Sequence, residues 1–240
     1  MKRTSALLAL LLSASVYAET APNLAITPVQ RPEAGCQARH EKFNAISKEG
    51  TAELVFLGDS ITQGWEGGGK AVWEKTWAPL KAANFGIGGD RTEHVLWRLE
   101  NGNFDGLKPK AIVLMIGTNN TGHQKTGGYQ SPAKNTAEGV KLILEKLKAK
   151  APQAKILVLG IFPRGATPDD TWRKQNEETN AIIKGYADDK TVFYMDIGSK
   201  FLAADGTLTP EIMPDRLHLS PKGYEIWAEA IEPKVKELLK

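Results

Sequence analysis

A serine and a histidine far apart in the chain have the surroundings of a nucleophile and its base. Ser60 lies in the motif Gly-Asp-Ser-Ile at 58–61, directly after an apolar run that is typical of a buried strand. His218 lies near the end of the chain in Asp-Arg-Leu-His at 215–218, three residues after Asp215. Serine needs an adjacent base near neutral pH, and imidazole, with an ordinary pKa of about 6.5, suits that task. The pattern therefore indicates nucleophilic attack on a carbonyl, with the carboxylate orienting the imidazole.

Two further loops are expected at the same edge of the sheet as Ser60. Asn-Phe-Gly-Ile-Gly-Gly-Asp at 84–90 follows the second expected strand, and Gly-Thr-Asn-Asn at 117–120 follows the third. Acyl transfer needs donors aimed at the negative oxygen of its tetrahedral intermediate. A glycine N–H and the neutral amide of Asn119 can supply them. Each motif alone is also ordinary turn or capping chemistry, so only the combination carries the inference.

Apolar runs and amphipathic segments alternate along the chain. Alternation of this kind implies parallel strands joined by crossover helices, and continuous apolar runs indicate strands covered on both faces. We therefore predict a three-layer α/β/α protein with a five-stranded parallel sheet. Strands are expected at 53–57, 83–86, 111–116, 155–161 and 192–196, and helices at 36–48, 91–101, 134–149, 172–187 and 221–239.

The length and composition of the chain predict a single domain that follows an export signal. With 240 residues and 41% hydrophobic side chains it can bury a sizeable core. Residues 1–18 combine an N-terminal positive charge, a short apolar stretch and a Val-Tyr-Ala cleavage site, which predicts a secretory signal peptide too short to span a bilayer. Residues 19–35, with three prolines, are expected to form an N-terminal arm or linker, and 36–240 the domain. The expected location is secreted or periplasmic.

Charge argues against a nucleic-acid binder, and the cysteine count excludes a fold held by an internal disulfide. The formal charge of +3 includes Lys2 and Arg3, so the chain without its signal has 29 basic and 28 acidic side chains. This balance argues against a nucleic-acid binder. Cys36 is the single cysteine and cannot form an internal disulfide, so we expect the core to hold the fold and this thiol to be a passive, buried or partly buried group.

No motif in the sequence calls for a cofactor or a metal. The segment 86–91 begins like a dinucleotide fingerprint, but Arg91 stands where the third glycine should be, and the segment follows the second strand. The remaining histidines, His40, His94 and His123, have no ligand-like spacing and are expected to be structural or exposed.

Two groups of side chains after the strands allow more than one role. Trp65, Trp73 and Trp77 could stack on a sugar ring, but packing against the sheet suits them better. Arg164 could hold an anionic substrate, and anchoring its own loop by hydrogen bonds is the role we favour.

The four motifs together resemble the signature blocks of the SGNH hydrolase superfamily, the GDSL-like lipases and esterases. The blocks are Gly-Asp-Ser, Gly, Gly-x-Asn and Asp-x-x-His, in that order. The sequence of four segments, 84–90, 94–99, 117–120 and 159–165, is similar to that of the catalytic subunits of intracellular platelet-activating factor acetylhydrolase. The resemblance covers about residues 52–240 and implies the flavodoxin-like SGNH hydrolase fold.

The resemblance also implies a role for each matching residue. It gives the nucleophile to Ser60, the base to His218 and the orienting carboxylate to Asp215. Asn120 stands where the superfamily more often has aspartate, and in this it is similar to the acetylhydrolase branch, which also has asparagine at that place. The backbone N–H groups of Ser60 and Gly89 and the side-chain amide of Asn119 would form the oxyanion hole, and Ile61, Thr118 and Leu217 would close around a small acyl group.

The expected function is a secreted serine esterase for short-chain, preferably acetyl, esters of carbohydrates. A lipid or lysophospholipid acylhydrolase is the second reading, and a noncatalytic carbohydrate-binding module that keeps the fold is the third. The intact motif set disfavours the third reading. The expected partner is a small-molecule or carbohydrate ester substrate. We expect no nucleic acid and no stable membrane insertion. The sequence is compatible with a homodimer as well as with a monomer.

Overall fold

A parallel β-sheet forms the centre of the protein, which we describe from a computed structural model over residues 22–122 and 130–240. The strand order is β2-β1-β3-β4-β5, and all pairs are parallel. This order reverses direction next to β1, and open α/β sheets bind ligands at such a switch point. The strands are β1 (Leu54–Gly58), β2 (Ala82–Gly86), β3 (Ala111–Met115), β4 (Lys155–Leu159) and β5 (Val192–Met195).

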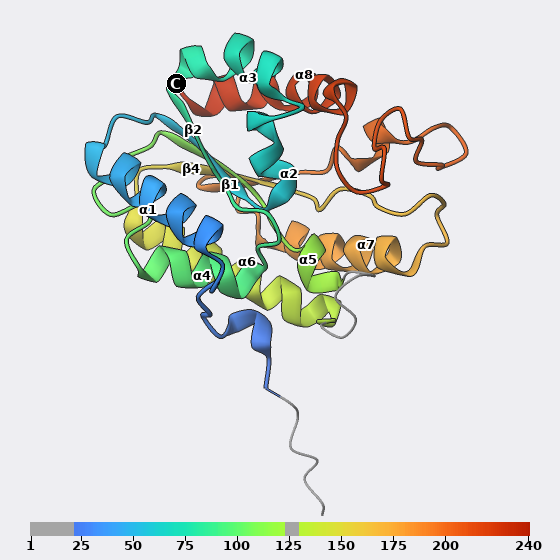
Figure 1. The fold of residues 1–240 in the computed structure, drawn as a ribbon, viewed down its shortest axis with the longest axis horizontal. Coiled ribbons are helices and arrows are strands. Elements are labelled where there is room, and N and C mark those ends of the chain that lie inside the picture. The colour runs from blue at the N-terminus through green and yellow to red at the C-terminus, as the bar shows by residue number, and fades with distance from the viewer. Residues whose placement is uncertain (1–21, 123–129) are drawn as a thin grey trace, which may run out of the picture.

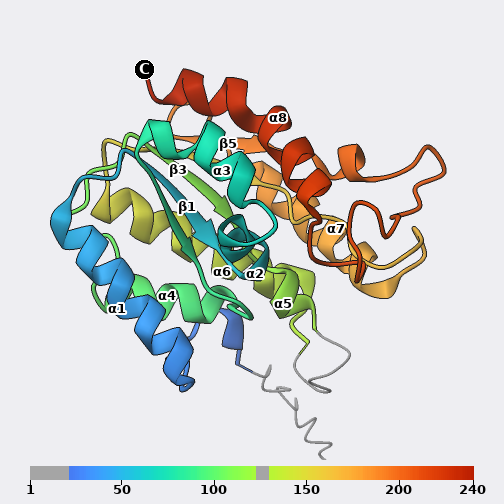
Figure 2. The same ribbon diagram turned by 45° about the horizontal axis from the view of Figure 1, so that its top comes forward.

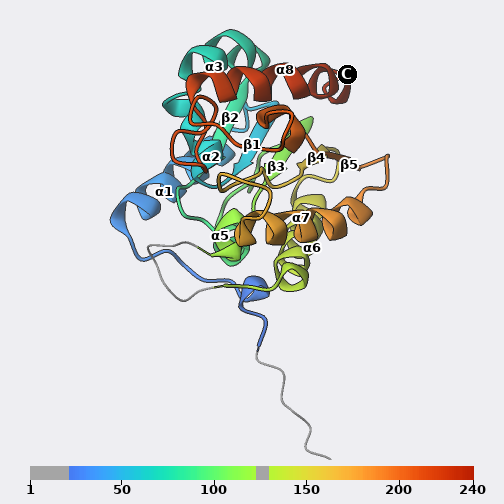
Figure 3. The same ribbon diagram turned by 90° about the vertical axis from the view of Figure 1, so that its right-hand side faces the viewer.

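Helices cover both faces of this sheet (Figure 1). Figure 3 shows one group of helices on each side of the strands, as the predicted three-layer architecture requires. The first group is α1 (Ala34–Glu49), α4 (Thr92–Glu100), α6 (Ala133–Lys150) and α7 (Thr171–Ile183), and the second is α3 (Lys70–Thr76) and α8 (Pro221–Leu238).

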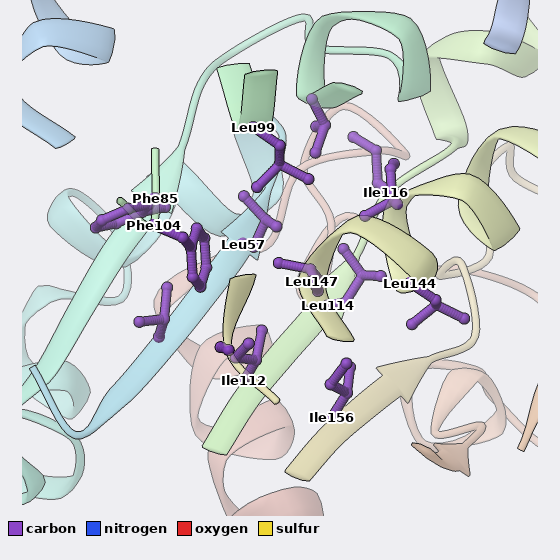
Figure 4. Packing of buried hydrophobic residues seen from close by; sticks show 14 of the residues in the cluster. Leu57, Phe85, Leu99, Phe104, Ile112, Leu114, Ile116, Leu144, Leu147 and Ile156 are labelled. Carbon is purple, nitrogen blue, oxygen red and sulfur yellow. The ribbon is translucent and has the colours of Figure 1, made fainter. Parts of the chain in front are cut away.

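The alternation of side chains along each strand divides the core in two. On β1, Val55 and Leu57 join the cluster beneath α1, α4 and α6, whereas Leu54 and Phe56 join the cluster beneath α3 and α8. Figure 4 shows the first cluster, in which strand side chains such as Leu57 and Leu114 meet Leu99 of α4 and Leu144 and Leu147 of α6. Each fully buried leucine of this kind contributes roughly 1.5–3 kcal/mol.

The predicted tryptophan packing is confirmed in the second cluster. Trp65 and Trp77 are fully buried around Phe56, with ring centroids 6.0 and 5.1 Å from its ring. Trp73 is half-buried and also contacts this ring. These side chains are therefore part of the core rather than a sugar platform.

Short helical turns connect the longer elements, and two of them, α2 (Ser60–Gln63) and α5 (Thr118–Thr121), follow β1 and β3 at the carboxyl edge of the sheet. Figure 2 shows α2 and α5 near the same end of the strands. The turns are α2 (Ser60–Gln63), α5 (Thr118–Thr121) and the 3-10 segments η1 (Leu24–Ile26), η2 (Gly64–Glu66), η3 (Ala78–Leu80), η4 (Lys184–Tyr186) and η5 (Gly198–Phe201). The predicted strands and long helices are confirmed, with ends shifted by at most four residues, the largest shift being at the end of α7, while these turns and α3 were not predicted.

The arm at 22–33 lies against α4 and α6. Its carbonyl at Ala25 accepts a hydrogen bond from Thr92 Oγ1 at 2.8 Å, and Val29 N donates to the Glu93 carbonyl at 3.2 Å. Ala25 itself is fully buried. These two bonds join the arm to the start of α4.

Three expectations about the chain as a whole meet the structure differently. The signal peptide predicted for 1–18 lies outside the described residues. Over 22–122 and 130–240, no helix is long and apolar enough to cross a bilayer. Cys36 is a half-buried free thiol on α1, as the sequence predicted, and burial raises its pKa.

Candidate active site

Ser60, His218 and Asp215 form a continuous chain of hydrogen bonds. The distance from Ser60 Oγ to His218 Nε2 is 2.8 Å, and the distance from His218 Nδ1 to Asp215 Oδ2 is 2.7 Å. The histidine and aspartate side chains are 44% and 57% exposed, so the group opens to solvent. In this arrangement Nδ1–H donates to the carboxylate, which leaves Nε2 free to accept the serine proton.

The end of β1 presents Ser60 at the sheet edge. Asp59 caps the turn α2, because its Oδ1 accepts from Ile61 N at 3.0 Å. Tyr224, in the first turn of α8, donates its hydroxyl proton to the Ile61 carbonyl at 2.7 Å. A side chain at Gly58 would collide with the Met115 carbonyl at 2.4 Å, so the strand end requires glycine.

A tight loop before α8 presents His218. Asp215 Oδ1 accepts from the backbone N–H groups of Leu217 and His218, at 3.1 and 2.7 Å. This turn places Arg216 at φ +62°, a conformation that non-glycine residues rarely adopt. The Arg216 carbonyl accepts from Gly165 N at 3.0 Å, which ties the loop to the segment after β4. The carboxylate therefore fixes both the backbone and the imidazole of the base.

Two carboxyl groups near Ser60 have shifted pKa values. Partial burial alone would raise the pKa of Asp215, but hydrogen bonds from the side chain and backbone of His218 hold it below its usual range. Burial raises the pKa of Asp59 to about 7. Asp215 is thus an ionised partner for an imidazolium, whereas Asp59 is stabilised in its neutral form.

The glycine loop after β2 lies beside the serine. A Cβ built on Gly88 would be 3.7 Å from Cβ of Ser60. The N–H of Gly88 donates to Gln63 Oε1 at 2.7 Å, and Gly89 has φ +77°, which favours glycine. Gln63 therefore holds the loop at Gly88, and the next backbone N–H is that of Gly89.

Asn119 joins this loop from the other side. Gly117, at φ +133°, turns the chain from β3 into α5, and a side chain there would meet Ile161 at 2.6 Å. Asn119 Nδ2 donates to the Asp90 carbonyl at 2.9 Å. An amide nitrogen carries two N–H groups, and this bond uses one of them.

The structure explains the asparagine at position 120. Asn120 is fully buried, and its Oδ1 accepts from Thr92 N at 3.0 Å. Its Nδ2 donates to Thr92 Oγ1 and to Glu93 Oε2, both at 3.0 Å. A carboxylate at this position would face the buried carboxylate of Glu93, so the neighbouring glutamate requires an amide here.

Arg164 holds the α5 segment. Its Nη1 donates to the carbonyls of Thr118 and Gly122 at 2.9 and 3.0 Å, and its guanidinium lies 5.0 Å from the Trp172 ring. The loop-anchoring role favoured from sequence is confirmed. By this contact Arg164 fixes the turn that carries Asn119.

The three side chains expected around an acyl group are all buried. Ile61 and Leu217 belong to the core cluster beneath α8, at 1% and 8% exposure. Thr118 is equally buried, with Oγ1 near Arg164 Nη1 at 3.3 Å. Each is adjacent in sequence to a residue of the candidate site: Ile61 to Ser60, Thr118 to Asn119 and Leu217 to His218.

The histidines outside the site are structural where the structure describes them. His94 Nδ1 accepts from Arg91 N at 3.0 Å, and burial lowers the pKa of His94 to about 3. His40 is buried beside Asn44, and His123 lies outside the described residues. Across 22–122 and 130–240, no three His, Cys, Asp or Glu side chains cluster as a metal site would require.

Sequence reasoning missed the residues that support the site from a distance. Gln63, Tyr224 and Arg31 all contact the catalytic loops, and Arg31 comes from the proline-containing arm. No local motif marks any of them, because each acts on a segment that only folding brings near.

Comparison with known proteins agrees with this fold and site. The profile of the GDSL-like Lipase/Acylhydrolase family matches residues 56–226. The chain is 37% identical over 216 residues to platelet-activating factor acetylhydrolase IB subunit alpha1 of Homo sapiens, covering 89% of each chain. Among solved structures it is similar to a GDSL-like lipase from Bacteroides thetaiotaomicron (TM-score 0.66, 19% identity, 83% of this chain and 98% of that one). It is also similar to an acetylxylan esterase from Geobacillus stearothermophilus (TM-score 0.62, 21% identity, 80% of this chain and 96% of that one).

The parallel sheet with a serine at its switch point therefore defines an α/β hydrolytic enzyme of the GDSL/SGNH class. The chain belongs to the GDSL-like lipase/acylhydrolase family, and it is an ester hydrolase. The resemblance seen in the sequence motifs is confirmed.

Proposed function

We propose that the protein is an exported serine esterase that removes short acyl groups, preferably acetyl, from carbohydrate esters. The observation that carries the proposal is the chain of hydrogen bonds from Asp215 through His218 to Ser60, with links of 2.7 and 2.8 Å. Such a chain allows a serine hydroxyl to lose its proton as it attacks. The export signal of residues 1–18 supports the location.

The reaction follows from the positions of these groups. Ser60 Oγ attacks the ester carbonyl carbon while its proton passes to His218 Nε2, and the carbonyl electron pair moves to oxygen. Collapse of the intermediate expels the alcohol oxygen, which takes that proton and leaves an acyl-serine. The same imidazole then takes a proton from a water that attacks the acyl-serine, and collapse of this second intermediate returns that proton to Ser60 Oγ and releases the acid. Asp215 stabilises the imidazolium in both halves.

Three donors would hold the negative oxygen of each intermediate. We assign them to the N–H groups of Ser60 and Gly89 and to the side-chain amide of Asn119. The contact of Asn119 with the Asp90 carbonyl and the 3.7 Å approach of the Gly88 position to Ser60 support this assignment. Donors of this kind contribute on the order of a hundred- to a thousand-fold each in rate.

The names of the similar proteins support an acetyl group. One relative is named an acetylhydrolase and one fold neighbour an acetylxylan esterase. The two differ in the alcohol to which the acetyl group would be attached. Identity of 37% to a platelet-activating factor acetylhydrolase subunit favours an acetylated phospholipid as the second candidate.

A comparison of substrates with two serine variants tests the proposal. The purified enzyme is assayed on a nitrophenyl acetate, an acetylated xylooligosaccharide and a phospholipid carrying one acetyl ester. Ser60→Ala should lose several powers of ten in kcat on every substrate hydrolysed, with an unchanged melting temperature. Ser199→Ala, an exposed serine on η5, is the matched control and should keep full activity.

Two results would decide against parts of the proposal. A folded Ser60→Ala variant that keeps more than about a tenth of the activity removes the nucleophile assignment, because loss of a triad member costs far more. Hydrolysis of the acetylated phospholipid alone, with no turnover of the acetylated sugar, replaces the carbohydrate reading with the lipid one.

A further inference from the structure

Arg31, in the N-terminal arm, contacts the glycine loop after β2. Its Nη1 donates to the Gly88 carbonyl at 3.2 Å. A Cβ built on Gly89 would lie 3.1 Å from Nη1 and 3.4 Å from Nη2, so the guanidinium is seated against the backbone of this residue. We propose that Arg31 is a positioning residue that orients the Gly89 N–H toward the substrate oxygen. This inference rests on the esterase function proposed above.

The planarity of the peptide group makes the contact directional. The Gly88 carbonyl and the Gly89 N–H belong to one trans peptide unit, so they point in opposite directions. A hydrogen bond that fixes the carbonyl toward Arg31 therefore fixes the N–H away from it. Both residues of this unit are glycines, which have more rotational freedom than any others. Without a partner on the carbonyl, the peptide could turn and withdraw its donor.

The charge of the guanidinium should also strengthen the donor. A hydrogen bond from a cation is shorter and stronger than one between neutral groups. Polarisation of the carbonyl draws electron density from the peptide nitrogen, and this makes the N–H a better donor. Arg31 thus acts through the peptide and does not itself need to touch the substrate.

Acidic partners hold Arg31 in place. Glu33 binds its Nε and Nη2 at 3.0 and 2.9 Å, and Asp90 Oδ1 lies 3.5 Å from Nη1. Asp90 is fully buried and is bound in turn by Arg98 Nε at 2.9 Å. The Arg31 side chain is only 18% exposed. Because acidic groups bind the planar guanidinium from two sides, its orientation is fixed. A fixed guanidinium can in turn orient the backbone donor.

The peptides on either side of the Gly88–Gly89 unit have their own partners, while Arg31 binds the carbonyl of the unit itself. Gln63 Oε1 accepts from Gly88 N at 2.7 Å, and Asp90 N donates to the Ile87 carbonyl at 3.1 Å, which closes a turn around the unit. The Asp90 carbonyl accepts from Asn119. The donor of Asn119 and the donor of Gly89 are thereby fixed on one short segment. Of the side chains that hold this segment, Arg31 is the one that comes from the arm. The arm therefore has a role in catalysis and not only in packing.

Arg31→Ala, Arg31→Lys and a matched arginine control test the proposal. Arg39 is the control, because it binds another carbonyl of the same loop, that of Gly86, at 3.0 and 2.8 Å. Arg31→Ala should lower kcat about 10- to 100-fold, which is less than loss of a whole donor, with KM changed by less than about twofold. Arg31→Lys keeps the charge without the fork and should recover part of the loss. Arg39→Ala should keep kcat within about threefold.

Two further readouts separate positioning from simple loop stability. Millimolar guanidinium should restore part of kcat in Arg31→Ala and leave the other forms unchanged. Methylboronic acid forms a tetrahedral adduct on a reactive serine, and its inhibition constant should rise in Arg31→Ala in parallel with the fall in kcat/KM.

The outcomes distinguish this inference from the proposed function. Loss of activity in Ser60→Ala together with an unchanged kcat in folded Arg31→Ala overturns the role of Arg31 alone. Equal losses in Arg31→Ala and Arg39→Ala, tracking their melting temperatures and without guanidinium rescue, also overturn it. If Ser60→Ala itself stays active, the proposed function fails first and the inference fails with it.

Discussion

Asn119 and Asp90 are linked by a hydrogen bond from the side-chain amide of the first to the carbonyl of the second, at 2.9 Å. Asp90 directly follows Gly89, so this bond joins the two loops that carry proposed oxyanion donors. The buried Asp90 side chain is bound by Arg98 and Arg31, and these ion pairs fix the residue at which the two loops meet. The donors therefore form one connected unit rather than two independent loops.

Replacing Asn119 should affect the transition state more than substrate binding. Asn119→Ala removes a donor that strengthens as the carbonyl oxygen gains charge, so we expect kcat to fall about 100- to 1,000-fold with little change in KM. Steady-state kinetics on nitrophenyl acetate measure this, with melting temperature as the control for folding. A raised KM at constant kcat would instead make Asn119 a substrate clamp.

The pair of Asn120 and Glu93 gives a prediction about stability. Asn120→Asp places a second carboxylate where Nδ2 now donates to Glu93 Oε2 at 3.0 Å. We expect a loss of roughly 2–4 kcal/mol in the free energy of unfolding at pH 8, because two buried like charges face each other. Adding Glu93→Gln to Asn120→Asp should restore most of it, since one partner is neutral again.

Urea unfolding of the wild type, both single variants and the double variant completes this cycle. If the losses of the two single changes simply add, the two side chains are not coupled, and the reason given for asparagine at position 120 is wrong.

The long elements and the hydrogen-bonded triad could be predicted from the sequence, because their signals are local. Continuous apolar runs mark strands buried on both faces, and Ser60 and His218 lie in motifs next to element ends. The turns α2 and α5 could not be predicted, since four residues carry no helical period and their shape depends on close packing at Gly58 and Gly117. Arg31 lies 57 residues from the carbonyl it binds, so nothing near it in sequence indicates a role.

Asp59 should make stability fall as the pH rises. Its pKa in the folded protein is raised to about 7 by burial, above the roughly 3.9 of an unfolded chain. Between these values the folded state binds more protons than the unfolded state. This contribution to stability is therefore fully present below about pH 4 and is lost as the pH rises through about 7.

Asp59→Asn tests this dependence and keeps an oxygen to cap Ile61 N. Its free energy of unfolding should exceed that of the wild type by about 1–3 kcal/mol at pH 8, because a buried neutral amide costs less than a buried charge. The difference should shrink at pH 5. Asp59→Ala, which loses the cap, is the control and should be less stable than Asp59→Asn at both pH values. A wild type more stable than Asp59→Asn at pH 8 would contradict the prediction.

The acyl group should be small, because the side chains around the nucleophile are already packed. Ile61 and Leu217 are held in the core beneath α8, and Thr118, the first residue of α5, is fixed by Arg164. A methylene that enters an apolar site gains about 0.8 kcal/mol, but one that finds no room must clash or stay in water. We expect kcat/KM to be highest for acetyl esters and to fall from butanoyl to octanoyl esters of one alcohol. Ile61→Ala should shift the optimum toward longer chains. A steady rise from acetyl to octanoyl in the wild type would mean that an open apolar surface, and not these three side chains, receives the acyl group.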